Sequence, residues 1–201
     1  MKYFRKKKKK KKFFDFEPLS KIITPLMIIC LIIFIILAII FKFNKLAIIL
    51  LALVFAGIPN FYNLYSSYKK RQRYLNMDFD EIDNLTGIEF EELLSTYYES
   101  LGYTVEDTPK VSDYGADLIL TKNGKRYVLQ AKRYKEKVGV KAVQEVVASK
   151  AHYNATGAIV ATNNFYTQNA WNLAKENHVF LIDRAKLIEL KDEVNSLQQN
   201  K

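Results

Sequence analysis

The stretch Ala116–Lys132 reads ADLILTKNGKRYVLQAK and predicts an antiparallel β-hairpin. Residues 116–121 and 126–132 are two short runs rich in strand-forming residues. Between them lies Asn123-Gly124, and an Asn-Gly pair flanked by such runs is the strongest short-range signal for a hairpin turn. We therefore expect two adjacent antiparallel strands in this part of the chain.

Three polar side chains are expected to meet at the open end of this hairpin. Side chains alternate between the two faces of a strand, so Gln130 and Lys132 share one face with Val128. Asp117 lies at the start of the partner strand. A carboxylate and an amide oxygen suit Mg²⁺, and a lysine beside them can supply charge or transfer a proton. Taken without their context, Asp117 and Lys132 are equally well interpreted as solvated strand ends.

A helix is predicted before the hairpin. Thr86 can cap it, and Glu89 three residues later completes a capping-box pattern. Apolar residues then recur at helical spacing as far as Leu101, and Gly102 ends the helix. Glu91 falls near the apolar side of this helix, where most glutamates are simply solvated.

The remaining elements predict an α/β fold. The run GAIVAT is short and almost wholly apolar, which is typical of a strand covered on both faces. Besides the hairpin we expect strands over 103–106, 157–162 and 179–182, and helices over 140–153, 167–175 and 184–197. This order predicts a mixed β-sheet flanked by helices on both faces.

A basic loop follows the hairpin. Residues 132–141 hold five basic residues against a single acid, Glu136, with Tyr134 interleaved. The basic residues are Lys132, Arg133, Lys135, Lys137 and Lys141. Such a patch beside an acidic metal site fits binding to a phosphate backbone, because neutralised phosphates release counterions. An ordinary solvated loop is the alternative interpretation.

The net charge of +10 over 201 residues comes from one segment. Lys2, Arg5 and Lys6–Lys12 contribute nine positive charges, which leaves 22 basic against 21 acidic residues elsewhere. From Asn76 onward there are 15 basic and 19 acidic residues, a net charge of −4. The C-terminal part is therefore not a generally basic nucleic-acid binder. The single cysteine, Cys30, excludes a disulfide within one chain.

Two apolar stretches follow a cationic tail, residues 1–20. Residues 22–41 are almost unbroken Ile, Leu and Phe, and about 20 apolar residues span the hydrocarbon core of a bilayer. Residues 46–65 form the second stretch, for which a Gly and a Pro leave a re-entrant or interfacial segment as the alternative. We expect a transmembrane helical hairpin over residues 21–68.

The basic residues on the outer sides of both apolar stretches predict an orientation. The tail and the cluster at Lys69–Arg73 carry many positive charges, whereas the turn between the stretches has two lysines. The positive-inside rule then puts both termini and the C-terminal domain in the cytoplasm, with the chain as a multi-pass protein of the cell membrane. The tail is expected to bind anionic lipid, and nucleic acid is its alternative partner. Residues 69–85 are expected to form a basic, then acidic linker.

The residues around the hairpin resemble the catalytic core of the Mrr-like restriction endonucleases, a branch of the PD-(D/E)XK nuclease superfamily. The central match joins Asp113–Asp117 with Gln130–Tyr134. The flanking matches are Gly87–Glu91, Leu101–Tyr103, Val138–Val140, and Phe165 with Ala170 and Ala174. The resemblance covers residues 86–190 and leaves 191–201 as the end of a C-terminal helix and a tail.

This resemblance implies a restriction-endonuclease-like fold and a Mg²⁺-dependent DNA endonuclease of the type IV restriction type, acting in defence against foreign DNA. Asp117 and Gln130 would hold the metal with help from Glu91, and Lys132 would position or activate the attacking water. The resemblance also implies DNA contacts from the basic loop, at Arg133, Lys135, Lys137 and Lys141. Gln130 departs from the Glu or Asp of the wider superfamily, although Mrr-like members commonly have Gln here.

Two other classes of function remain open. A catalytically weak or inactive membrane-tethered DNA-binding module would have the same basic loop and the same weakened metal site. A structural membrane scaffold would need no cluster of Asp117, Gln130 and Lys132. The sequence also leaves a homo-oligomer open and carries no signal for a preferred DNA sequence or modification.

Overall fold

The computed structural model describes residues 25–26, 28–34, 36, 45–109 and 114–199. The chain divides into two compact units, residues 1–70 and 71–201. The predicted cationic tail and part of the first predicted apolar span lie outside the described residues. Within the described ranges, no helix combines the length and the apolar character needed to cross a membrane.

The first unit is helical wherever it is described. Residues 25–26, 28–34 and 36 are helical, and α2 (Lys45–Asn76) begins in the first unit and ends in the second. The transmembrane hairpin expected over 21–68 has no support from these described parts, and the turn expected between its two spans falls mainly on residues outside them.

The second unit is built on a five-stranded sheet with the order β1-β2-β3-β4-β5. The strands are β1 (Thr104–Asp107), β2 (Leu118–Lys122), β3 (Lys125–Lys132), β4 (Gly157–Thr162) and β5 (Val179–Ile182). The first three strands pair antiparallel, whereas β3, β4 and β5 pair parallel. The predicted mixed sheet is therefore confirmed.

The hairpin of β2 and β3 forms at the expected turn. Lys122 pairs with Lys125 across it, and Asn123 and Gly124 between them have φ angles of 52° and 73°. Positive φ at both central residues is the geometry that Asn-Gly adopts most readily. This turn fixes the register in which Leu118 faces Leu129.

Five helices surround the sheet. They are α3 (Phe79–Ile82), α4 (Gly87–Ser100), α5 (Val140–His152), α6 (Gln168–Glu176) and α7 (Arg184–Gln199). The predicted capping box at the start of α4 is present, because Glu89 N donates to Thr86 Oγ1 at 3.2 Å and Thr86 N donates to Glu89 Oε2 at 2.8 Å. The predicted Thr167 cap of α6 is also present.

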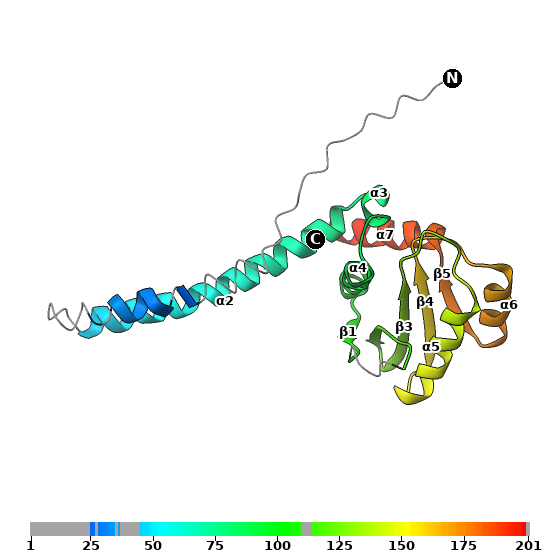
Figure 1. Ribbon diagram of the computed structural model, residues 1–201, viewed down its shortest axis with the longest axis horizontal. Coiled ribbons are helices and arrows are strands. Elements are labelled where there is room, and N and C mark those ends of the chain that lie inside the picture. The colour runs from blue at the N-terminus through cyan, green and yellow to red at the C-terminus, as the bar shows by residue number, and fades with distance from the viewer. Residues whose placement is uncertain (1–24, 27, 35, 37–44, 110–113, 200–201) are drawn as a thin grey trace, which may run out of the picture. The chain divides into compact units, whose positions relative to one another are not determined.

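The helices cover opposite faces of the sheet (Figure 1). One buried cluster joins α4 and α7 to the side chains of Leu118, Leu120 and Leu129. The other joins α5 and α6 to Val128 and Val160. We call these the α4 face and the α5 face. Alternation along β3 puts Gln130 and Lys132 on the α5 face.

Part of the expected linker is packed into the α4 face. Its buried residues, each at most 2% exposed, are Tyr74, Leu75, Met77, Ile82 and Leu85. Tyr74 Oη also donates to Glu92 Oε2 at 2.5 Å, and Arg71 Nη1 lies 2.6 Å from Glu99 Oε2. Residues 71–85 are therefore part of the domain. Their composition is polar, but their scattered apolar side chains are buried. Val194, in the expected end of the C-terminal helix, is fully buried as well.

Candidate functional site

The structure brings Asp117 and Gln130 together, as the hairpin predicted. Gln130 Nε2 donates to Asp117 Oδ2 at 2.7 Å, and the backbone N of Ala131 donates to the same oxygen at 2.6 Å. Asp117 N in turn donates to the carbonyl of Leu129 at 2.8 Å. The carboxylate is thus held by the backbone of β3 as well as by a side chain.

The amide oxygen of Gln130 is a candidate ligand for a cation. Gln130 is only 4% exposed, and its Oε1 is buried with no hydrogen-bond partner among the described residues. Leaving such an acceptor buried and unpaired costs about 1–3 kcal/mol. A carboxylate and an unpaired amide oxygen side by side are the hard ligands that Mg²⁺ takes, so the residues present fit this ion.

The protein ligands for such an ion are few. No three His, Cys, Asp or Glu side chains converge on a possible metal position within the described part of the chain. Mg²⁺ commonly keeps several waters and uses one or two carboxylates together with substrate phosphates. Asp117 and Gln130 are consistent with that mode of binding.

Lys132 lies on the same strand face as Gln130 and has a partner that sequence reasoning missed. Its side chain is 18% exposed, and Nζ lies 3.0 Å from Glu145 Oε2 on α5. Its carbonyl accepts a hydrogen bond from Thr162 Oγ1 at 2.6 Å. Helical spacing could have identified Glu145, because it follows the buried residues Ala142 and Val143 on the helix after the hairpin.

A glycine allows the turn before Asp117 to pack against α5. Gly115 has a φ of +87°, and a Cβ at this position would lie 2.6 Å from the carbonyl oxygen of Glu145. Glycine is the residue that adopts this backbone conformation without strain, and here it also removes a clash. The turn that carries Asp117 is therefore seated directly on the helix that carries Glu145.

Glu91 lies in the second turn of α4 and is partly buried. Its helix packs on the α4 face with Leu118 and Leu129, whereas Gln130 and Lys132 share the other face with Val128. The assignment of Glu91 to the metal stays a prediction.

The basic loop is fastened to the loop after β4. Tyr134 N donates to Asn163 Oδ1 at 3.0 Å, and Val138 N donates to the Phe165 carbonyl at 2.9 Å. On this fixed backbone Lys135, Lys137 and Lys141 are exposed. Arg133 differs from these three, because it is partly buried and its Nη1 donates to the Asp83 carbonyl at 3.5 Å.

A polar network that sequence reasoning missed anchors this end of the sheet. Asp83 Oδ1 accepts from Arg184 Nη1 at 2.7 Å and from Asn163 Nδ2 at 2.9 Å. Burial raises the pKa of Asp83, but the hydrogen bonds from Arg184 and Asn163 and the charges of Arg184 and Arg133 outweigh it and leave that pKa below its ordinary value. The network joins the loop after α3 to the loop after β4 and to the start of α7.

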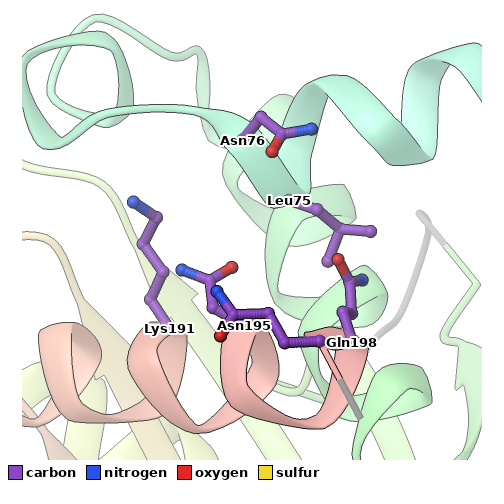
Figure 2. Close-up of a pocket in the computed structure, with 6 residues that line it drawn as sticks. Leu75, Asn76, Lys191, Asn195 and Gln198 are labelled. Atoms are coloured by element: carbon purple, nitrogen blue, oxygen red, sulfur yellow. The ribbon is translucent and has the colours of Figure 1, made fainter. Parts of the chain in front are cut away.

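A separate pocket lies between the end of α2 and α7. Its lining is formed by Leu75, Asn76, Lys191, Asn195, Gln198 and Gln199 (Figure 2). None of the predicted site residues lies in this lining, and its side chains include no carboxylate. It is therefore distinct from the cluster of Asp117, Gln130 and Lys132.

Known proteins give the cluster a family context. A comparison with curated proteins found no match. Among solved structures, a protein of unknown function, AF1548, is 17% identical, with a TM-score of 0.43, and covers 51% of this chain and 65% of its own. The DNA modification-dependent restriction endonuclease AspBHI is 16% identical, with a TM-score of 0.47, and covers 66% of this chain and 41% of its own. The chain thus spans less than two thirds of either protein.

The family model for the restriction endonuclease domain Mrr_cat matches residues 82–191. This match covers more than half of the 201 residues and includes every predicted site residue. The chain therefore belongs to the Mrr_cat family of restriction endonucleases.

Proposed function

We propose that this protein is a Mg²⁺-dependent DNA endonuclease that hydrolyses phosphodiester bonds. Membership of a restriction endonuclease family supports a nuclease that acts on DNA. The observation that carries the metal dependence is the buried Gln130 Oε1, which has no hydrogen-bond partner among the described residues and belongs to the amide that contacts Asp117.

Asp117 and Gln130 would hold the ion, with Glu91 as a further ligand. When bound, Mg²⁺ supplies Lewis-acid stabilisation of the charge that develops on the phosphate. The hydrogen bonds from Gln130 and from the Ala131 backbone fix the orientation of the Asp117 carboxylate before substrate arrives. Such prior orientation avoids reorganisation during the reaction.

Lys132 has the position of a catalytic cation in this proposal. It lies two residues beyond Gln130 on the same strand face, so its ammonium can orient the attacking water or stabilise negative charge on the phosphate. The hydrogen bond from Thr162 to its carbonyl holds its backbone in place. Exposed Lys135, Lys137 and Lys141 would neutralise the neighbouring phosphates of the DNA.

A second function is favoured by one observation, the neutral side chain of Gln130. Without a second carboxylate the ion loses one full negative charge of attraction, which weakens its binding. The alternative is therefore a DNA-binding module with weak or no cleavage. Its basic loop and its fold would be the same.

Membrane anchoring is a separate part of the proposal and rests on composition alone. The nine positive charges of the tail and the cluster at Lys69–Arg73 would bind an anionic leaflet, at about 1 kcal/mol for each residue near the surface. Both termini and the nuclease domain would then be cytoplasmic. Flotation of the full chain with vesicles, with and without anionic lipid, tests this part by itself.

The experiment that tests the function compares binding with cleavage. The full chain is incubated with supercoiled plasmid in Mg²⁺, in EDTA, and in EDTA followed by excess Mg²⁺, while a mobility shift measures binding of a short duplex. The proposal expects cleavage in Mg²⁺, none in EDTA, and recovery on adding Mg²⁺. Binding without cleavage at any Mg²⁺ concentration would favour the inactive module, and neither binding nor cleavage would reject both functions.

A further inference from the structure

We infer that Glu145 is a positioning residue that holds the ammonium of Lys132 beside the Asp117–Gln130 pair. This inference rests on the proposed function and names a residue that the family resemblance did not supply. The observation behind it is the distance of 3.0 Å between Lys132 Nζ and Glu145 Oε2, in a pair whose side chains are 18% and 30% exposed.

Lys132 needs such a partner for two reasons. Its side chain has four rotatable bonds, so its ammonium has no fixed place unless another group restrains it. The side chain is also mostly covered, and a covered charge is stable only when it is paired. Glu145 meets both needs with a single contact.

Glu145 itself is well placed, because it is held from two sides. It lies on α5 between Val143 and Val146, which are both fully buried, so its helix is anchored on the sheet. Its carbonyl oxygen also lies where a Cβ on Gly115 would clash at 2.6 Å. Glu145 therefore contacts two parts of the site. Its side chain pairs with Lys132, and its backbone packs against the turn before Asp117.

The second carboxylate oxygen has a weaker partner. Glu145 Oε1 lies 3.8 Å from Lys141 Nζ, and the Lys141 side chain is 86% exposed. Exposed ion pairs at such a distance contribute little, so Lys132 is the dominant partner. Lys141 is one of the residues proposed to bind phosphate, and a phosphate there would leave the carboxylate to Lys132 alone.

The test uses Glu145→Gln and Glu145→Asp in the full chain. Glutamine removes the charge, whereas aspartate keeps it and shortens the side chain by one methylene. The matched control is Glu106→Gln, because Glu106 pairs with Arg126 at 3.7 Å on β1 and β3 and is more than half exposed. Thermal unfolding of each variant checks that the fold is retained.

The first readout needs neither metal nor DNA. Acetylation of individual lysines is followed by mass spectrometry, with Lys122 as internal reference, since Lys122 Nζ donates to the Leu101 carbonyl at 2.7 Å. In Glu145→Gln, the rate for Lys132 relative to Lys122 is expected to rise about fivefold, the effect of losing a modest ion pair. In Glu106→Gln the ratio should not change.

The second readout separates kcat from KM. Glu145→Gln is expected to lower kcat at least about tenfold and to leave KM for DNA within about twofold, because a misplaced ammonium affects the transition state more than binding. Glu145→Asp should give an intermediate kcat. The stabilisation of the fold by Mg²⁺, measured as a shift in Tm, should match the wild type in both variants.

Each contrary result has one meaning. An unchanged acetylation ratio, or an unchanged kcat in Glu145→Gln, overturns the inference. Loss of the Mg²⁺-induced shift in Tm also overturns it, because Glu145 would then be a metal ligand. If the wild type does not cleave DNA, the proposed function fails, and the acetylation ratio still decides by itself whether Glu145 holds Lys132.

Discussion

The two faces of the sheet are built from different residues and do different work. The α4 face packs leucines of β2 and β3 against large side chains such as Phe90 and Tyr97. The α5 face packs small residues, Val128, Ala158 and Val160, against the valines of α5. It ends in Gln130 and Lys132.

This difference shows how a polar site can be placed beside a buried core. Small side chains and Gly115 let α5 approach the strands closely enough for Glu145 to reach Lys132 at 3.0 Å. The Gln130 amide oxygen, which has no hydrogen-bond partner in the described part of the chain, and the covered Lys132 ammonium both cost folding free energy. Burial of large apolar side chains on the α4 face, such as Phe90 and Tyr97, offsets that cost.

The largest effect on folding is expected from deleting residues 71–85, which contribute to the α4 face. A fragment of residues 71–201 should fold, whereas a fragment of residues 86–201 should not. The shorter one lacks five fully buried apolar side chains, each contributing about 1.5–3 kcal/mol, and total stabilities are about 5–15 kcal/mol. Far-ultraviolet circular dichroism with urea titration compares them, and a cooperative transition in both would show that residues 71–85 are dispensable.

Adjacent core residues on β3 allow the two faces to be compared directly. Leu129 and Val128 are both fully buried and point to opposite faces. Leu129→Ala should lower the free energy of unfolding by about 2–5 kcal/mol, and Val128→Ala, which removes fewer methylenes, by about 1–2 kcal/mol.

Cleavage by these two variants sharpens the comparison. Per folded molecule, Leu129→Ala should keep the wild-type rate, whereas Val128→Ala should be slower, because Val128 supports the strand face that carries Gln130 and Lys132. Urea titration gives the stabilities, and equal cleavage rates for both variants would mean that the faces are not specialised.

Gln130→Glu adds a charge to the polar end of the α5 face. Two carboxylates side by side repel without metal and attract a divalent ion more strongly, so the fold should lose stability in EDTA and bind Mg²⁺ on the order of tenfold more tightly. Isothermal titration with Mg²⁺ measures the affinity. An unchanged affinity would show that Gln130 does not touch the ion.

The basic loop is expected to set the salt dependence of DNA binding. Neutralising Lys135, Lys137 and Lys141 together should flatten the plot of log K against log salt concentration by about 0.9 for each lost phosphate contact. Lys125→Gln is the control, since Lys125 is exposed at the turn of the hairpin, the opposite end from the site. A slope that flattens equally in the control would assign the effect to overall charge.

Asp83 gives the smallest expected effect, on stability in acid. Its pKa in the folded protein lies below the ordinary value of 3.8, so its contribution to stability is present above that pH and is lost as pH falls through the lowered pKa. Asp83→Asn should therefore be less stable than the wild type at neutral pH, and the difference should shrink below about pH 4. A difference in urea midpoint that stays constant down to pH 2 would remove Asp83 from this role.

The sequence alone predicted the features that depend on residues close together in the chain. The Asn-Gly turn fixes the register of β2 and β3, and alternation then places Asp117 beside Gln130. Glu145 and Arg184 were missed because their partners are set by how α5 and α7 pack on the sheet. Asp83 and Arg184, for example, are 101 residues apart. The packed part of the expected linker was missed because its buried residues follow no single period.

The most direct test of the central claim is single-turnover cleavage of DNA in Mg²⁺ by the wild type, Asp117→Ala and Lys132→Ala. Asp107→Ala serves as a control, because Asp107 is an exposed carboxylate at the end of β1. The site at the polar end of the α5 face predicts cleavage by the wild type and the control, and a loss of at least about a hundredfold in both site variants with their fold intact. Wild-type rates in either Asp117→Ala or Lys132→Ala would contradict it.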